Sequence, residues 1–126
     1  MQKTIWTDEN FKPKYDLKPE GNAGNMFYGC NFTDFKGICE KQGIILDTSN
    51  VTDCQALFGE CYWLTRLPAI SLPNCKVVNS PFSYCTVLVS VDKLILNDTG
   101  SQTFNRTFNA CNKLTDIAIE GVIGQN

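Results

Sequence analysis

The stretch from Ser83 to Leu96, SYCTVLVSVDKLIL, constrains the fold most, because its composition fits a β-strand and not a helix. Its β-branched and apolar residues suit a pleated, half-buried surface. Side chains alternate between the two faces of a strand, so we expect Val87, Val89 and Val91 on the core face. The chain is therefore expected to be organised around a central strand.

A change of pattern at Asp92-Lys93 divides this stretch. The residues that follow, Leu94 to Leu96, are predicted either to return as a second strand across a tight turn or to continue as one bent strand. Cys85 lies near the start of the stretch. A disulfide is therefore expected to anchor the central strand.

Outside the central stretch, the sequence predicts short elements. Thr52-x-x-Gln55 has the form of a capping box, and the apolar residues after it recur at helical spacing. A helix of about two turns is therefore expected after Thr52, stopping near Gly59 and burying the stripe Cys54, Leu57, Phe58 and Cys61. Short strands are expected at Gly43–Leu46, Val77–Val78 and Ile117–Ile119. No internal repeat is evident.

The chain has 126 residues and 43% hydrophobic content, which is enough for one domain with a core. Residues 1–25 are interpreted as an extended N-terminal lead-in, and residues 26–126 as a single globular domain. The predicted fold class is mainly β: a small, disulfide-stapled antiparallel β-sheet or sandwich with one or two short helices. No apolar run is long enough to span a membrane, so direct membrane insertion is not expected.

Seven cysteines in a chain of this length far exceed cytosolic usage. Zinc sites need Cys-x-x-Cys pairs or histidines, and the sequence has neither, so disulfides are the interpretation and no metal or other cofactor is expected. An odd number leaves one thiol for another chain or for a cysteine outside this segment. About 105 connectivities are then open. The disulfide candidates are Cys30, Cys39, Cys54, Cys61, Cys75, Cys85 and Cys111.

Four Asn-x-Thr sequons give a second indication of the secretory pathway, because such sequons are the acceptors of N-linked glycans. The alternative is that they belong to polar loops that are simply rich in Asn and Thr. Together with the cysteines, they predict an extracellular protein, either secreted or on a virion surface. The sequons begin at Asn31, Asn50, Asn97 and Asn105.

The sequence excludes several function classes. It contains no histidine, which removes Ser-His and Cys-His catalysis. Ser90-x-x-Lys93 has the form of a known catalytic motif, but that motif requires the serine to open a helix, and here it ends a strand. No enzymatic activity is therefore expected. The net charge of −2, without a basic cluster, also makes nucleic-acid binding unexpected.

The distribution of sequons predicts where a partner binds. A glycan hides the surface around it, and no sequon lies between Asp53 and Leu96. Aromatic residues and arginine beside cysteines in this window are the expected contacts, because such side chains dominate binding energy and a fixed loop loses little entropy. The alternative is that Tyr62 and Trp63 are core residues. The predicted contact residues are Tyr62, Trp63, Arg66, Phe82 and Tyr84.

Two segments resemble the C-terminal, receptor-binding domain of coronavirus spike S1 subunits. Phe27-Tyr28-Gly29-Cys30-Asn31-Phe32 is similar to the aromatic entry of that domain, and Cys111-Asn112-Lys113-Leu114-Thr115, followed by Ile117, is similar to its exit. The resemblance implies a small, glycosylated, disulfide-stapled β domain that binds a host cell-surface protein through loop tips.

The leading hypothesis is therefore an extracellular, glycosylated binding domain, specifically the receptor-binding domain of a viral spike glycoprotein. Its partner would be a host cell-surface protein receptor, and the chain would belong to a larger oligomeric envelope protein. The alternative is a secreted immune-evasion or inhibitor protein from a virus or parasite, for which the same disulfides and glycans would serve.

Overall fold

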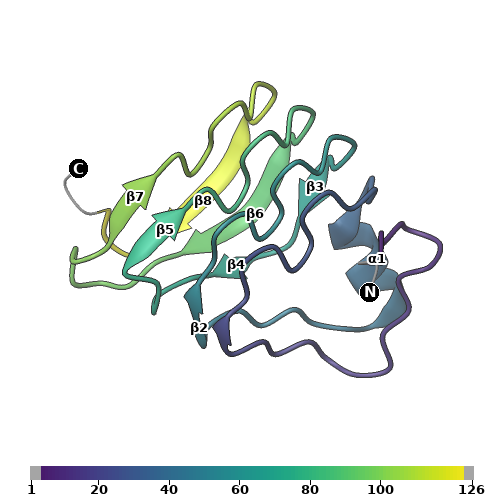
Figure 1. The fold of residues 1–126 in the computed structure, drawn as a ribbon, viewed down its shortest axis with the longest axis horizontal. Coiled ribbons are helices and arrows are strands. Elements are labelled where there is room, and N and C mark those ends of the chain that lie inside the picture. Colours follow the sequence, from purple (N-terminus) through teal and green to yellow (C-terminus); the bar gives the residue numbers. More distant parts are fainter. Residues whose placement is uncertain (1–3, 124–126) are drawn as a thin grey trace.

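The computed structural model describes residues 4–123, which form a stack of similar turns wound around one core (Figure 1). Among these residues, every strand pairing is parallel. Mainly β structure is thus confirmed, but the antiparallel sheet or sandwich is wrong, because each turn advances the chain by one strand in the same direction. The elements are β1 (Gly21–Asn22), α1 (Phe35–Gln42), β2 (Val51–Asp53), β3 (Arg66–Leu67), β4 (Ile70–Ser71), β5 (Val77–Asn79), β6 (Ser90–Ile95), β7 (Thr103–Asn105) and β8 (Asp116–Glu120).

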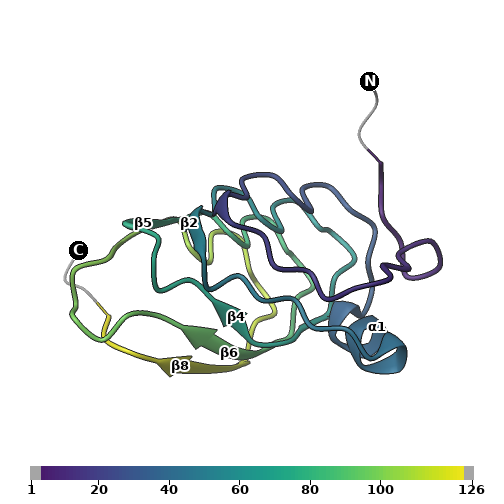
Figure 2. The ribbon, with the colours of Figure 1, turned by 90° about the horizontal axis from the view of Figure 1, so that it is seen from below.

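The strands form the walls of the stack. β6 pairs with β3, β4 and β8 in the main sheet, while β5 pairs with β7 and β1 pairs with β2 in two small ones. Figure 2 shows β4, β6 and β8 along one side of the molecule, with β2 and β5 along the other. None of the described helices is long and apolar enough to cross a membrane.

A four-fold repeat of Phe-x-x-Cys underlies the stack, so the expectation of no internal repeat is wrong. Successive copies begin 31, 24 and 26 residues apart. The first copy forms the corner that precedes α1, and the other three form the corners that precede β3, β6 and β8 of the main sheet. Backbone hydrogen bonds join equivalent corners of neighbouring turns: the Gly29 amide donates to Gly59 (2.8 Å), Glu60 to Ser83 (2.7 Å) and Tyr84 to Asn109 (2.8 Å). The copies are Phe27–Cys30, Phe58–Cys61, Phe82–Cys85 and Phe108–Cys111.

The cysteines contribute to the core as thiols. The structure has them as thiols and not as disulfides, and all but the half-buried Cys111 are buried. The structure therefore differs from the expectation of a disulfide-stapled domain. The interior of the stack explains why so many cysteines occur: small, weakly polar side chains fill the corners, where bulkier residues would force the turns apart.

The central strand runs without a break as β6, so the bent-strand alternative is right and the hairpin at Asp92-Lys93 is wrong. Its pairing with β8 shifts register between Val91 and Leu94, which is where the sequence pattern resets. Leu88 and Val91 face the core, whereas Val89 is 44% exposed, so the predicted alternation is wrong ahead of the strand. There the chain is still turning, and strand periodicity does not apply.

The helix lies elsewhere than predicted. Residues 55–60 form tight turns, not a helix, whereas α1 begins after Asp34 and ends at Gly43. Asp34 caps α1 by accepting a 2.9 Å hydrogen bond from the Gly37 amide. Gly43 closes it in a left-handed conformation, φ 64°, which glycine adopts without steric cost. Of the expected strand at 43–46, only one bridge forms, between Leu46 and Leu17. The strands predicted at 77–78 and 117–119 are confirmed as β5 and β8.

Candidate functional site

The five predicted contact residues separate into three groups in the structure. Tyr62, Trp63 and Tyr84 are 46%, 63% and 47% exposed, so the alternative that placed Tyr62 and Trp63 in the core is wrong. Phe82 is fully buried, and Arg66 belongs to a polar network on the main sheet. Only the first group can meet a partner as free aromatic surface.

Phe82 must be removed from the predicted contacts. It is the phenylalanine of the third Phe-x-x-Cys copy, and its ring stacks on that of Phe108 at 5.8 Å between centroids. Every turn of the stack needs a large apolar side chain at this corner to fill the space between its two walls. Phe82 is therefore a core residue, and exposure to a partner would require the turn to unfold.

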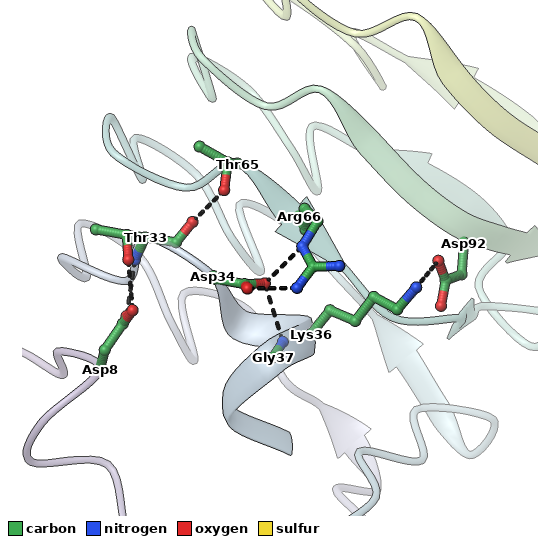
Figure 3. Close-up of polar contacts among 8 residues, drawn as sticks. All are labelled: Asp8, Thr33, Asp34, Lys36, Gly37, Thr65, Arg66 and Asp92. Atoms are coloured by element: carbon green, nitrogen blue, oxygen red, sulfur yellow. Dashed lines mark hydrogen bonds and ion pairs between the residues drawn. The ribbon is translucent and has the colours of Figure 1, made fainter. Parts of the chain in front are cut away.

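Arg66 has a structural role (Figure 3). Its Nε donates to Asp34 Oδ1 at 3.0 Å, and its Nη2 bonds the second carboxylate oxygen, so the pair is bidentate. Next to it, Lys36 of α1 pairs with Asp92 of β6 at 2.9 Å. Both ion pairs join the first turn of α1 to the main sheet. Arg66 is thus already engaged and is a weak candidate for partner contact.

A cluster of exposed aromatic residues surrounds Glu60 at the corners of three successive turns. The hydroxyl groups of Tyr28 and Tyr62 both donate to the Glu60 carboxylate, the latter at 2.9 Å. Tyr84 lies in the next turn, close enough for its hydroxyl to interact electrostatically with that of Tyr62. We name the surface formed by Tyr28, Glu60, Tyr62, Trp63 and Tyr84 the aromatic edge.

Sequence reasoning missed Tyr28 and Glu60. Tyr28 is the second residue of the first copy, and Glu60 is the third residue of the second copy. Aligning the copies would have placed Glu60 beside Tyr84, the third residue of the next copy, because equivalent positions of a stack lie one above another. The repeat is thus the signal that could have found Glu60, whereas Tyr28 aligns with Gly59 and only its hydrogen bond to Glu60 places it at the edge.

The backbone at the aromatic edge is strained at the residue before each cysteine. φ is positive in all four copies: 68° at Gly29, 54° at Glu60, 61° at Tyr84 and 58° at Ala110. Glycine adopts this left-handed conformation freely, whereas a side chain costs about 1 kcal/mol or more. Glu60 and Tyr84 thus occupy positions at which glycine would suit the fold better.

The hydrogen bonds also set the ionisation of the edge. The bond from Tyr28, and then that from Tyr62, lower the pKa of the Glu60 carboxyl below its ordinary value. The same bonds raise the pKa values of the two phenols, because each donates its proton to the carboxylate. At neutral pH the edge therefore carries one negative charge among neutral aromatic rings.

The sequons are distributed differently in space than in sequence. Asn31, Asn50 and Asn105 are exposed, while Asn97 is half-buried and its Nδ2 donates to the Pro73 carbonyl at 3.3 Å. Asn31 follows the cysteine of the first copy, and Tyr62 follows that of the second, so the two lie in neighbouring turns. A sequon-free window in sequence therefore does not mark out a glycan-free surface.

Among residues 4–123, no group of three or more His, Cys, Asp or Glu side chains is placed to hold a metal ion. No protein-family model matches the sequence, and comparisons with curated proteins and with solved structures find no match. The two segments that resemble spike receptor-binding domains overlap the first and last copies of the repeat. The functional argument consequently rests on the aromatic edge.

Proposed function

We propose that this protein is an extracellular binding domain that attaches to a cell-surface protein through the aromatic edge. One observation carries the proposal: three successive turns bring Tyr28, Tyr62 and Tyr84 together around Glu60, Trp63 follows Tyr62 in the chain, and the four residues are 36–63% exposed. Clustered exposed aromatic residues are uncommon on a surface that meets only water. Tyrosine and tryptophan supply large contact area and lose little conformational entropy on binding.

The rigidity of the stack supports this role. Each corner is tied to the next turn by backbone hydrogen bonds, among them that from the Glu60 amide to Ser83 (2.7 Å). Aromatic side chains on such corners are held in place before a partner arrives. The loop therefore loses less conformational entropy when the partner binds.

Four sequons support an extracellular location, and the asparagines of three are exposed. Binding through the aromatic edge requires Asn31 to stay unglycosylated, because Asn31 lies in the turn next to Tyr62. The cysteines add nothing to this argument, because buried thiols in a repeated corner serve packing in any compartment. The resemblance to spike domains makes viral attachment to a host receptor the specific form of the proposal. A secreted immune-evasion or inhibitor protein would use the same edge, and neither form requires enzymatic activity.

The test is a cell-binding assay with the fluorescently labelled domain. Trp63→Ala and Tyr84→Ala should each weaken binding by about 2 kcal/mol, or roughly thirtyfold, without loss of folding. Tyr15→Ala is the matched control, since Tyr15 is 81% exposed and lies in the N-terminal segment outside the aromatic edge. Trypsin treatment of the cells should abolish binding. Equal binding by all three variants would remove the aromatic edge as the binding surface.

A further inference from the structure

We propose that the aromatic edge binds a guanidinium group, that of an arginine side chain on the partner. The inference rests on the proposed function and adds the chemistry of the group that the edge recognises. It is carried by two features of the edge: a carboxylate that forms no ion pair within residues 4–123, and the tyrosines that contact it.

The Glu60 carboxylate has no counterion among the residues that the structure describes. Among residues 4–123 the ion pairs are Lys36 with Asp92, Arg66 with Asp34, and Lys93 with Glu120, and Glu60 is in none of them. Each Glu60 oxygen accepts one tyrosine hydroxyl. A carboxylate has about four acceptor positions, so each oxygen keeps one for an external donor. Two parallel N–H donors match two such oxygens, and arginine presents them as a planar fork.

The rings complete the site. A cation close to an aromatic face is attracted by the negative π-cloud, and guanidinium also stacks on such faces. Tyr28 and Tyr62 reach the Glu60 carboxylate with their hydroxyl groups, which donate to it, so two phenol rings lie next to this acid. Tyr84 follows in the next turn. A guanidinium bound to Glu60 would therefore lie near aromatic rings, which a lone surface glutamate would not provide.

The experiment titrates the intact domain with three capped tripeptides, acetyl-Gly-X-Gly-amide, in which X is arginine, lysine or citrulline. Citrulline keeps the shape of arginine but has no charge. Chemical shifts of the backbone amides of Tyr28, Glu60, Tyr62 and Tyr84 report binding. The arginine peptide should bind about tenfold more tightly than the citrulline peptide and more tightly than the lysine peptide.

Glu60→Gln keeps the size and hydrogen-bonding shape of the side chain but removes its charge, and should weaken the arginine peptide about tenfold. Asp98→Asn is the control, because Asp98 is an exposed acid in the turn that follows β6, whereas the corners of the edge precede the strands of the main sheet. Equal binding of arginine and citrulline peptides, or unchanged binding to the Glu60→Gln variant, would overturn the inference. If cell binding still requires Trp63 in that case, the proposed function survives and only the arginine assignment falls. Stronger binding of the lysine peptide would also overturn the guanidinium assignment.

Discussion

The thiol of Cys85 donates a hydrogen bond to the carbonyl oxygen of Phe58 in the preceding turn, with 3.0 Å between sulfur and oxygen. The equivalent thiols repeat the bond: Cys61 donates to Phe27 and Cys111 to Phe82, each at 3.1 Å. Burial raises the pKa of the Cys111 thiol to about 11, so it stays protonated and able to donate at neutral pH. These thiols satisfy a carbonyl group at each corner, and the stack needs no covalent bridge there.

Reduction is therefore expected to leave the fold unchanged. A domain stapled by disulfides would lose roughly 2 to 5 kcal/mol for each bridge removed, whereas free thiols have no bridge to lose. The thermal unfolding transition should be the same with and without excess reductant. Thiol titration of the denatured, unreduced protein should count all seven cysteines. A large fall in the transition temperature on reduction would contradict the structure at these corners.

Phe82→Ala and Trp63→Ala should have opposite effects. Phe82 is fully buried, so its truncation leaves a cavity and should lower the free energy of unfolding by about 3 to 5 kcal/mol. Trp63 is 63% exposed, and its truncation should change stability by about 0.5 kcal/mol or less. Denaturant unfolding of both variants measures the difference. Comparable losses would mean that Trp63 packs into the core after all.

Protonation of the Asp34 carboxyl should make the free energy of unfolding depend on pH. Burial raises the pKa of its carboxyl, but the bonds from Arg66 and the Gly37 amide outweigh burial, and the net direction is downward. A carboxyl whose pKa is lowered in the folded state adds stability above its unfolded pKa, about 3.9. This stability is lost as the pH falls through the folded pKa. Stability measured between neutral pH and about pH 2 should therefore fall less in Asp34→Asn than in the parent.

Two substitutions separate the charge of Asp34 from its role as a helix cap. Asparagine caps helices as well as aspartate does, so Asp34→Asn should cost only the exposed ion pair, about 0 to 1 kcal/mol at neutral pH. Asp34→Ala also removes the bond to the Gly37 amide and should cost about 1 kcal/mol more. Equal stabilities of the two variants at neutral pH would show that the cap contributes nothing.

Glycan occupancy should differ among the four sequons. The Asn97 nitrogen that would carry the sugar donates to the Pro73 carbonyl, and its Oδ1 accepts from the Thr99 amide at 3.2 Å. A glycan there opposes the local fold, whereas Asn50 is exposed at the start of β2. Glycopeptide mass spectrometry on protein from a secretory host should find Asn50 occupied and Asn97 least occupied. Full occupancy of Asn97 in a stable protein would contradict this ranking.

The sequence was sufficient to predict a mainly β domain and several strand positions, because short β-branched runs such as Val77–Val78 allow little else. It was not sufficient for strand direction. Parallel pairing follows from the repeat, and copies of Phe-x-x-Cys at uneven spacings of 31, 24 and 26 residues do not show as a regular period. The cysteines also admit two interpretations, as bridges or as corner packing, and composition alone favours bridges.

The misplaced helix has a similar physical origin. Cys54, Leu57, Phe58 and Cys61 recur at helical spacing, and all four are indeed fully buried. They face the core from tight turns, because positive φ at Ala56 (52°) and Glu60 (54°) reverses the chain where a helix would continue. Burial periodicity reports which side chains point inward. It does not report the sign of φ, and the aromatic edge depends on that sign.

The unequal copies also define how this chain can change in length. Removal of the 24 residues from Phe58 to Pro81 would join Leu57 to Phe82 and present Ser83 where Gly59 now accepts the Gly29 amide. The remaining turns could still form the backbone hydrogen bonds that join neighbouring corners. We therefore expect deletion or duplication of a whole turn to change the length of the protein but not its fold. A single residue inserted within a corner would instead shift the amide and carbonyl groups out of line with those of the neighbouring turn. Lineages of this protein should therefore vary in steps of a turn, with smaller differences in length falling in the α1 region of the first turn, which is helical and not part of a sheet.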